Sequence, residues 1–141
     1  MSLGTIGKLE LVLDEMVSKT NTEIGRCVVT NERGLIVAEK KTLSTSNETL
    51  AAMISLLSDT ALRINRNLGL NDPNTATIES METTFSMCEF PVNNKRFRIG
   101  VITEGNGTKL KRRNFLRRRK YEDLDDTLRI AAKSIQKILE G

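Results

Sequence analysis

The feature that most constrains the fold is a long amphipathic segment, residues 47–68, whose apolar face is unusually wide. Apolar residues recur there at steps of three and four, which is typical of a helix with one buried side. The central stripe consists of Leu50, Ile54, Leu57, Ala61, Ile64 and Leu68, and it is widened by Met53 and Leu56 on one side and by Ala51 and Leu62 on the other. A helix that packs on a single sheet needs only one apolar face. The excess width indicates either a second contact surface, such as a twin helix from another subunit, or a deep groove within the same domain.

Both ends of this helix carry boundary signals. Thr45 and Glu48 have the spacing of a capping box, in which the two side chains bond to backbone N–H groups of the first turn. Gly69 can adopt the positive φ of a residue that follows a helix. Asn71–Asn74 is a strong turn sequence, and we therefore expect the helix to end before the next β-rich segment begins.

The other predicted elements are short. We expect an N-terminal helix with a stripe of Ile6, Leu9, Val12/Leu13 and Met16/Val17 that ends near Lys19, then strands at 26–30, 35–39, 75–81, 84–92 and 96–103, and a final helix at 122–139. Gly34 can supply the positive φ that a type I turn with a bulge needs between the first two strands. Asn93 and Asn94 are suited to a second tight turn.

Length and composition fit one globular domain that spans residues 1–141. Hydrophobic residues make up 38% and charged residues 28%, which are ordinary values for a soluble protein. No segment approaches the roughly 18 apolar residues of a membrane span, and no basic-then-apolar leader is present, so we expect a cytoplasmic protein. Cys27 and Cys88 lie in apolar, strand-like segments and are expected to be small buried side chains in a reducing compartment.

The net charge of +4 hides an asymmetry. Residues 109–120 read KLKRRNFLRRRK, with eight basic residues and no acidic one, while the rest of the chain carries 14 basic against 18 acidic residues. The basic residues are Lys109, Lys111, Arg112, Arg113, Arg117, Arg118, Arg119 and Lys120. This basic segment predicts a surface for nucleic-acid phosphates, anionic membrane headgroups or an acidic protein partner. The alternative is a solvated loop that is partly shielded by the acidic residues 122–126.

Residue types that support catalysis are scarce. The chain has no histidine, which excludes Ser-His-Asp and Cys-His nucleophile pairs and histidine metal sites. Cys27 and Cys88 lack the close spacing of a zinc or redox motif, and the glycines of 105–109 are wrongly spaced for a phosphate loop. We therefore expect no catalytic residue, no metal and no cofactor, and predict that the protein is not an enzyme.

Four segments carry a resemblance to a known family, which extends over about residues 5–138. They are the helix with Leu9, Leu13 and Val17 that leads into 25–29, the strand–turn–strand pattern at 31–38, the opening Leu50-Ala51-Ala52-Met53 of the second helix, and the third strand at 76–79. In this order they resemble the roadblock family. The chain departs from the family at 107–120, where members more often have a short connection to the last helix.

The resemblance implies a profilin-like α/β (α+β) fold, in which one five-stranded antiparallel sheet has helices on both faces in the order α-β-β-α-β-β-β-α. It also implies a homodimer, or a heterodimer with a paralogue, formed through the second helix and the third strand. The implied interface residues are Leu50, Met53, Ile54, Leu57, Ala61, Ile64, Thr77 and Glu79. Similar prokaryotic members are thought to regulate Ras-like GTPases, whereas eukaryotic members serve in dynein and lysosomal signalling scaffolds.

Two functional hypotheses follow. The first is a non-catalytic dimeric adaptor that binds and modulates a small Ras-like GTPase, and it predicts a stable dimer. The second is a polyanion-binding module that uses residues 109–120, and it predicts binding that weakens steeply with salt. An enzyme on this scaffold is a third and weaker hypothesis, because the residues that catalysis needs are missing.

Overall fold

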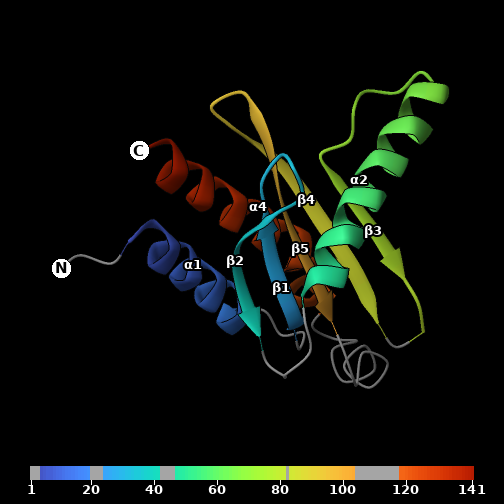
Figure 1. Cartoon of the computed structure of the whole chain (residues 1–141). Helices are drawn as coiled ribbons and strands as arrows, with labels where there is room; N and C mark the ends of the chain where they lie inside the picture. The colour runs from blue at the N-terminus through green and yellow to red at the C-terminus, as the bar shows by residue number, and fades with distance from the viewer. Residues whose placement is uncertain (1–3, 20–23, 42–46, 82, 104–117) are drawn as a thin grey trace.

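The computed structural model describes residues 4–19, 24–41, 47–81, 83–103 and 118–141 (Figure 1). Its helices are α1 (Thr5–Lys19), α2 (Glu48–Asn67) and α4 (Arg118–Glu140), and its strands are β1 (Ile24–Thr30), β2 (Ile36–Lys41), β3 (Thr75–Glu79), β4 (Thr84–Val92) and β5 (Lys95–Thr103). The elements occur in the predicted order. Their ends lie within two residues of the predicted ones, except that α4 begins at Arg118 instead of 122.

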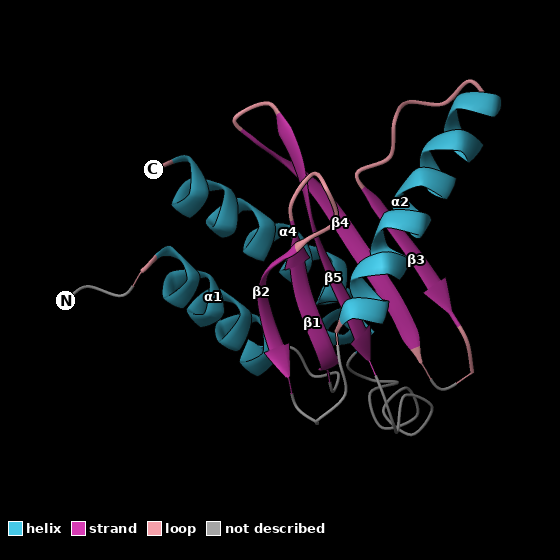
Figure 2. Ribbon diagram, viewed as in Figure 1, coloured by secondary structure: helices cyan, strands magenta, loops and turns pink. Residues whose placement is uncertain are grey.

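The five strands form one antiparallel sheet in the order β2-β1-β5-β4-β3. α1 and α4 pack side by side on one face of this sheet, and α2 crosses the opposite face (Figure 2). β2 and β3 are the two edge strands. The expected α+β fold with helices on both faces of a five-stranded antiparallel sheet is therefore confirmed.

Two tight turns set the register of the sheet. Gly34 has φ +81° between β1 and β2, its N–H donates to the Asn31 carbonyl at 2.9 Å, and the Asn31 N–H donates to the Leu35 carbonyl. Asn93 and Asn94, between β4 and β5, have φ values of 49° and 68°. Two consecutive positive φ angles define the type I′ loop, which matches the twist of an antiparallel pair. Both predicted turns are confirmed.

The larger hydrophobic core lies between the sheet and the pair α1 and α4. Its fully buried residues include Leu9, Leu13, Cys27, Val29, Ile99, Val101, Leu128 and Ile135. The Phe90 and Phe97 rings meet at a centroid distance of 6.2 Å and an interplanar angle of 44°, within the range of favourable aromatic pairs. Ile6 was predicted to lie in the α1 stripe but is 60% exposed, because it belongs to the first turn.

The core under α2 is much smaller. It consists of four buried residues, Val28, Leu50, Ile54 and Met87, with partly buried neighbours around them. Ile54 packs directly over Gly100 of β5, where a Cβ atom would overlap its side chain. α2 therefore approaches the sheet closely at one point of its length.

The two ends of α2 differ in how their backbone groups are satisfied. At the C-terminal end, Gly69 has φ +71° and its N–H donates to the Arg66 carbonyl, while the Leu70 N–H donates to the Asn65 carbonyl. These two bonds form a Schellman motif, which confirms the predicted role of Gly69. At the other end Asn47 is the N-cap residue and makes no side-chain capping bond. Thr45 of the predicted capping box lies outside the described residues.

Candidate functional site

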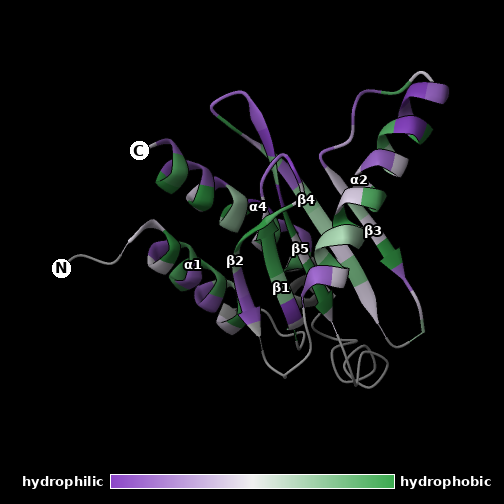
Figure 3. Ribbon diagram, viewed as in Figure 1, coloured by the Kyte–Doolittle hydropathy of each residue, from purple (hydrophilic) through white to green (hydrophobic). Residues whose placement is uncertain are grey.

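One flank of α2 presents apolar side chains that its own chain does not cover. Met53, Leu56, Ile64 and Leu68 are between 42% and 68% exposed. The spacing of Met53, Leu56 and Ile64 places them on one side of the helix, beside the residues that contact the sheet. Leu68 is the C-cap residue and lies in line with Leu50, beyond the part of α2 that covers the small core. Apolar stretches along α2 and at the end of β3 are visible in Figure 3. Several large exposed apolar residues on one helix flank mark a contact surface more strongly than scattered ones do.

This flank is continuous with the edge strand β3. Within the described residues β3 pairs with β4 only, so its outer row of backbone N–H and C=O groups lacks a neighbouring strand. Ile78 of β3 is 54% exposed and faces the same side as α2, because its register partner Phe85 packs in the small core. An unpaired edge beside an apolar helix is a template for strand addition.

A groove joins the two elements at the N-terminal end of α2. It has a volume of about 510 Å³ and is lined by Leu50, Met53, Ile78, Phe85 and Ile102, with Arg26, Thr49, Ser80, Thr83 and Thr84 at its polar edge. The apolar residues of this groove come from α2 and from three strands of the sheet. We refer to the exposed flank of α2, the edge strand β3 and this groove as the α2–β3 surface.

The predicted interface residues fall into two groups in the structure. Leu50 and Ile54 are buried in the protomer core, and Leu57 and Ala61 are half-buried. Met53, Ile64, Thr77 and Glu79 are exposed. All eight belong to α2 or β3, but Thr77 lies on the sheet face opposite α2, where its hydroxyl bonds to that of Ser86 at 3.0 Å. Glu79, two residues further along β3, is on the same face as Thr77.

Sequence reasoning left three exposed residues out of the interface set. Leu56 was assigned to the margin of the α2 stripe, and Leu68 was assigned to its centre. Ile78 was not singled out, although it is the one large apolar residue of β3. The sequence signal that could have marked the strand as an edge is its scarcity of large apolar residues, because a fully buried strand is typically a continuous apolar run.

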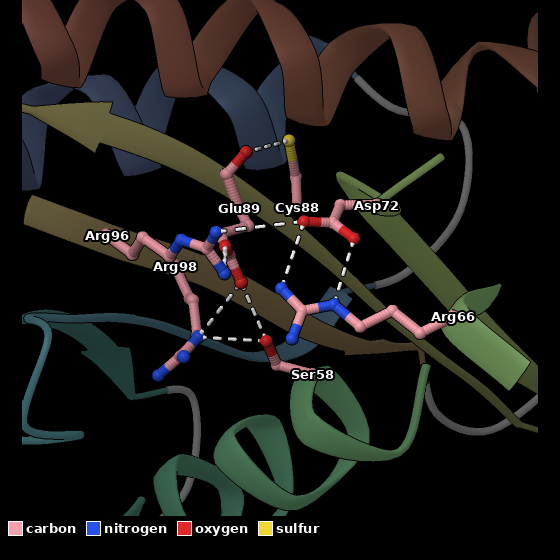
Figure 4. Close-up of polar contacts among 7 residues, drawn as sticks. All are labelled: Ser58, Arg66, Asp72, Cys88, Glu89, Arg96 and Arg98. Carbon is pink, nitrogen blue, oxygen red and sulfur yellow. Dashed lines mark hydrogen bonds and ion pairs between the residues drawn. The ribbon is translucent and has the colours of Figure 1, made fainter. Parts of the chain in front are cut away.

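A polar network lies under the middle of α2 (Figure 4). Ser58 Oγ of α2 donates to Glu89 Oε2 of β4 at 2.7 Å, and Arg98 Nε of β5 donates to Ser58 Oγ at 3.1 Å and to Glu89 Oε2 at 3.3 Å. Ser58 is 7% exposed, and the side chains of Arg98 and Glu89 are 12% and 14% exposed. Three elements are thus joined by charge-assisted hydrogen bonds in a largely water-excluded position.

The network continues outward to the loop after α2. Arg96 Nη1 lies 3.4 Å from Glu89 Oε1, and its Nη2 lies 4.0 Å from Asp72 Oδ2. Arg66 contacts both Asp72 oxygens at 3.3 Å. The hydrogen bond from Arg66 lowers the pKa of Asp72, and the bond to Asp72 raises the pKa of Arg66. These outer residues are solvent-exposed, so their contribution is screened by water and salt.

The described residues offer few candidates for a nucleophile or a metal site. Cys27 and Cys88 are both buried and unpaired, as predicted. Burial raises the pKa of the Cys27 thiol, and burial raises the pKa of the Cys88 thiol to about 11, so neither forms a reactive thiolate near neutral pH. No cluster of three or more potential metal ligands occurs within those residues. Among the helices that the structure describes, none is long and apolar enough to cross a membrane.

The predicted basic segment falls mostly on residues whose structure is not described. Lys109, Lys111, Arg112, Arg113 and Arg117 lie outside the described residues. Arg118, Arg119 and Lys120 form the first turn of α4.

Comparison with solved structures gives whole-chain matches. MglB from Myxococcus xanthus superposes with a TM-score of 0.70 at 15% identity, covering 99% of this chain and 93% of that one. An MglB with a tetrameric arrangement gives a TM-score of 0.74 at 12% identity, again covering 99% and 93%. A roadblock/LC7 domain from Streptomyces avermitilis gives 0.68 at 13% identity, covering 94% and 98%. No protein-family model and no curated protein matches the sequence.

These matches give the class of the fold, a small α+β domain built on one five-stranded antiparallel sheet. Within that class the chain has the roadblock/LC7 fold, which it shares with MglB. The fold that the sequence resemblance implied is therefore confirmed over nearly the whole chain.

Proposed function

We propose that the protein is a non-catalytic adaptor that self-associates through the α2–β3 surface and modulates a small Ras-like GTPase. The observation that carries this proposal is the continuity of the exposed α2 flank with the unpaired edge of β3. Addition of a second β3 would extend the sheet at this edge, and a second α2 would cover the exposed apolar residues.

The distribution of exposed apolar residues supports a symmetric pair. Met53 and Ile78 lie together at the groove end of the surface. Ile64, Leu68 and Leu70 lie at the opposite end of α2, where the chain turns toward the start of β3. A two-fold axis near the centre of β3 would place the groove end of one copy against the opposite end of the second copy. A closed dimer requires this self-complementarity. One of the structural neighbours is itself an MglB with a tetrameric arrangement.

The GTPase part of the proposal rests on the family resemblance and on the shared fold with MglB. The absence of histidine and the buried, unreactive thiols support a role in binding over a role in catalysis. A heterodimer with a paralogue would use the same surface.

The decisive experiment compares two matched leucines on opposite faces. Leu56 on α2 is 59% exposed and Leu11 on α1 is 54% exposed. Leu56→Glu places a charge in the proposed interface and is expected to turn a dimer into a monomer in light scattering, while Leu11→Glu leaves the mass unchanged. A wild-type chain that stays monomeric over the whole accessible concentration range would sink the proposal.

The GTPase activity is tested separately. Hydrolysis of GTP by the small Ras-like GTPases of the source organism is measured with wild-type protein, Leu56→Glu and Leu11→Glu. We expect a changed turnover rate with wild type and Leu11→Glu only. Unchanged rates for every GTPase would remove this part of the proposal and leave self-association standing.

The basic segment carries a second candidate function, binding of polyanions. It predicts retention of nucleic acid or anionic vesicles that falls sharply between low and moderate salt. The Arg117→Ala, Arg118→Ala and Arg119→Ala triple variant should lose that binding, and undiminished binding by this variant would refute the role.

A further inference from the structure

We infer that Ser58, Glu89 and Arg98 are positioning residues, which fix the rotation of α2 on the sheet and so decide which flank of the helix meets the second copy. The inference rests on the proposed self-association and assigns a cause to its specificity. It concerns side chains that lie beneath the helix and are largely shielded from any partner.

The need for such a device follows from the small size of the core under α2. Leu50 and Ile54 are the two large apolar side chains of α2 that are fully buried against the sheet, and both lie in its first two turns. Ser58 is the next buried residue and the last one along the helix. Beyond it, the remaining residues of α2 are half-buried or exposed.

An apolar contact of this size sets the distance between helix and sheet but leaves the rotation weakly defined, because apolar packing is not directional. Ile54 over Gly100 makes a single pivot. A rotation about that pivot would carry Met53, Leu56 and Ile64 either toward the β3 edge or away from it. The exposed flank can match a second copy in only one of these orientations.

The hydrogen bonds of Ser58 fix the rotation that apolar packing leaves open. Its hydroxyl is held between a carboxylate oxygen of β4 and a guanidinium nitrogen of β5, at 2.7 Å and 3.1 Å. Hydrogen bonds to charged groups weaken steeply when their angles change. Since Glu89 and Arg98 are register partners on neighbouring strands, the anchor for Ser58 is as rigid as the sheet.

The network contributes little to folding stability, which agrees with a role in setting the orientation of α2. A buried ion pair loses much of its Coulomb energy to desolvation, and apolar replacements of similar size are often as stable. The network is therefore a weak source of folding stability. An apolar replacement of the network would keep the stability but would no longer fix the rotation of α2 on the sheet.

The experiment uses Ser58→Ala, which removes the link to α2 and leaves the Glu89–Arg98 pair intact. Ser55→Ala is the matched control, since it makes the same change one turn earlier on the same helix, at a side chain that faces Gly34. The dissociation constant for self-association is measured by sedimentation for both variants. We expect Ser58→Ala to weaken self-association at least about tenfold, the change that loss of one charge-assisted hydrogen bond can produce, and Ser55→Ala to leave it unchanged.

Amide hydrogen exchange tests the inference even if the chain does not self-associate. In the Leu56→Glu background, Ser58→Ala is expected to speed exchange in α2 beyond residue 58 and to leave α4 unchanged. A triple variant with Ser58→Ala, Glu89→Leu and Arg98→Met replaces the whole network with apolar side chains. It should unfold at a urea concentration close to that of wild type, but its self-association should be weaker than that of wild type.

The outcomes separate the two proposals. A monomeric wild type refutes the proposed self-association, whereas unchanged exchange along α2 overturns the positioning role. Faster exchange with an unchanged dissociation constant also overturns it, because α2 would then be loosened without consequence for the surface.

Discussion

The two faces of the sheet are built differently. Among the described residues, the core under α1 and α4 contains sixteen buried residues, whereas the core under α2 contains four and is joined by a polar network. α1 and α4 also pack against each other, while α2 is the one helix on its side among those that the structure describes (Figure 2). One face therefore supplies the hydrophobic burial that folding requires, and the other leaves apolar surface and a sheet edge available for contact.

The difference shows how a small domain can separate stability from recognition. Apolar burial stabilises the folded state in proportion to the area removed from water, and most of the described core residues lie under α1 and α4. The α2 side is then free to carry residues that would be unsuitable in a core, such as Ser58 and Arg98.

The largest expected effect compares two fully buried isoleucines, one from each face. Ile135 of α4 and Ile54 of α2 are both 0% exposed. Truncation to alanine in such positions costs about 2–5 kcal/mol. We expect Ile135→Ala to fall near the top of that range and Ile54→Ala near the bottom, because the thinner layer around Ile54 can collapse into the space. Urea unfolding gives both values, and an equal or larger loss for Ile54→Ala would break the comparison.

An intermediate effect is expected at Gly100. Gly100→Ala places a Cβ against the Ile54 side chain, and overpacking of this kind costs about 1–3 kcal/mol. Ile54→Val removes the atom nearest to the new Cβ, so the double variant should recover part of the loss. Additive losses in a double-mutant cycle would show that α2 does not rest on Gly100.

The smallest effect is expected at the exposed pair of Arg66 and Asp72. Because Arg66 lowers the pKa of Asp72 in the folded state, the pair stabilises the fold above the unfolded-state pKa of about 3.9 and loses this effect as the pH falls through the folded-state pKa. The difference in urea midpoint between wild type and Asp72→Asn should therefore be small near neutral pH and vanish in acid. A difference that grows as the pH falls would contradict this assignment.

Local sequence patterns were sufficient to predict most of the fold. The turns at Gly34 and Asn93–Asn94 require positive φ angles that few residues adopt, so their chemistry fixes their place in the chain. The α2 stripe was equally clear, because its period is regular over five turns. The start of α4 was missed by four residues, since charged residues such as Arg118 and Arg119 carry no apolar period.

The candidate site was less accessible to such reasoning. The wide stripe of α2 shows that more than one surface is contacted, but it cannot show that Leu50 and Ile54 face the sheet while Leu56 faces outward. That division depends on how α2 is rotated over Gly100. The pairing of Ser58 with Glu89 and Arg98 joins residues 31 and 40 positions apart, and no local pattern connects them.

The thin core under α2 has a consequence for how the protein responds to its own concentration. If a second copy covers the α2–β3 surface, each added chain shifts the equilibrium toward the folded, associated form by mass action. The melting temperature should then rise with the amount of protein in the sample, and the rise should be absent in Leu56→Glu. A domain built in this way is most resistant to unfolding when it is abundant.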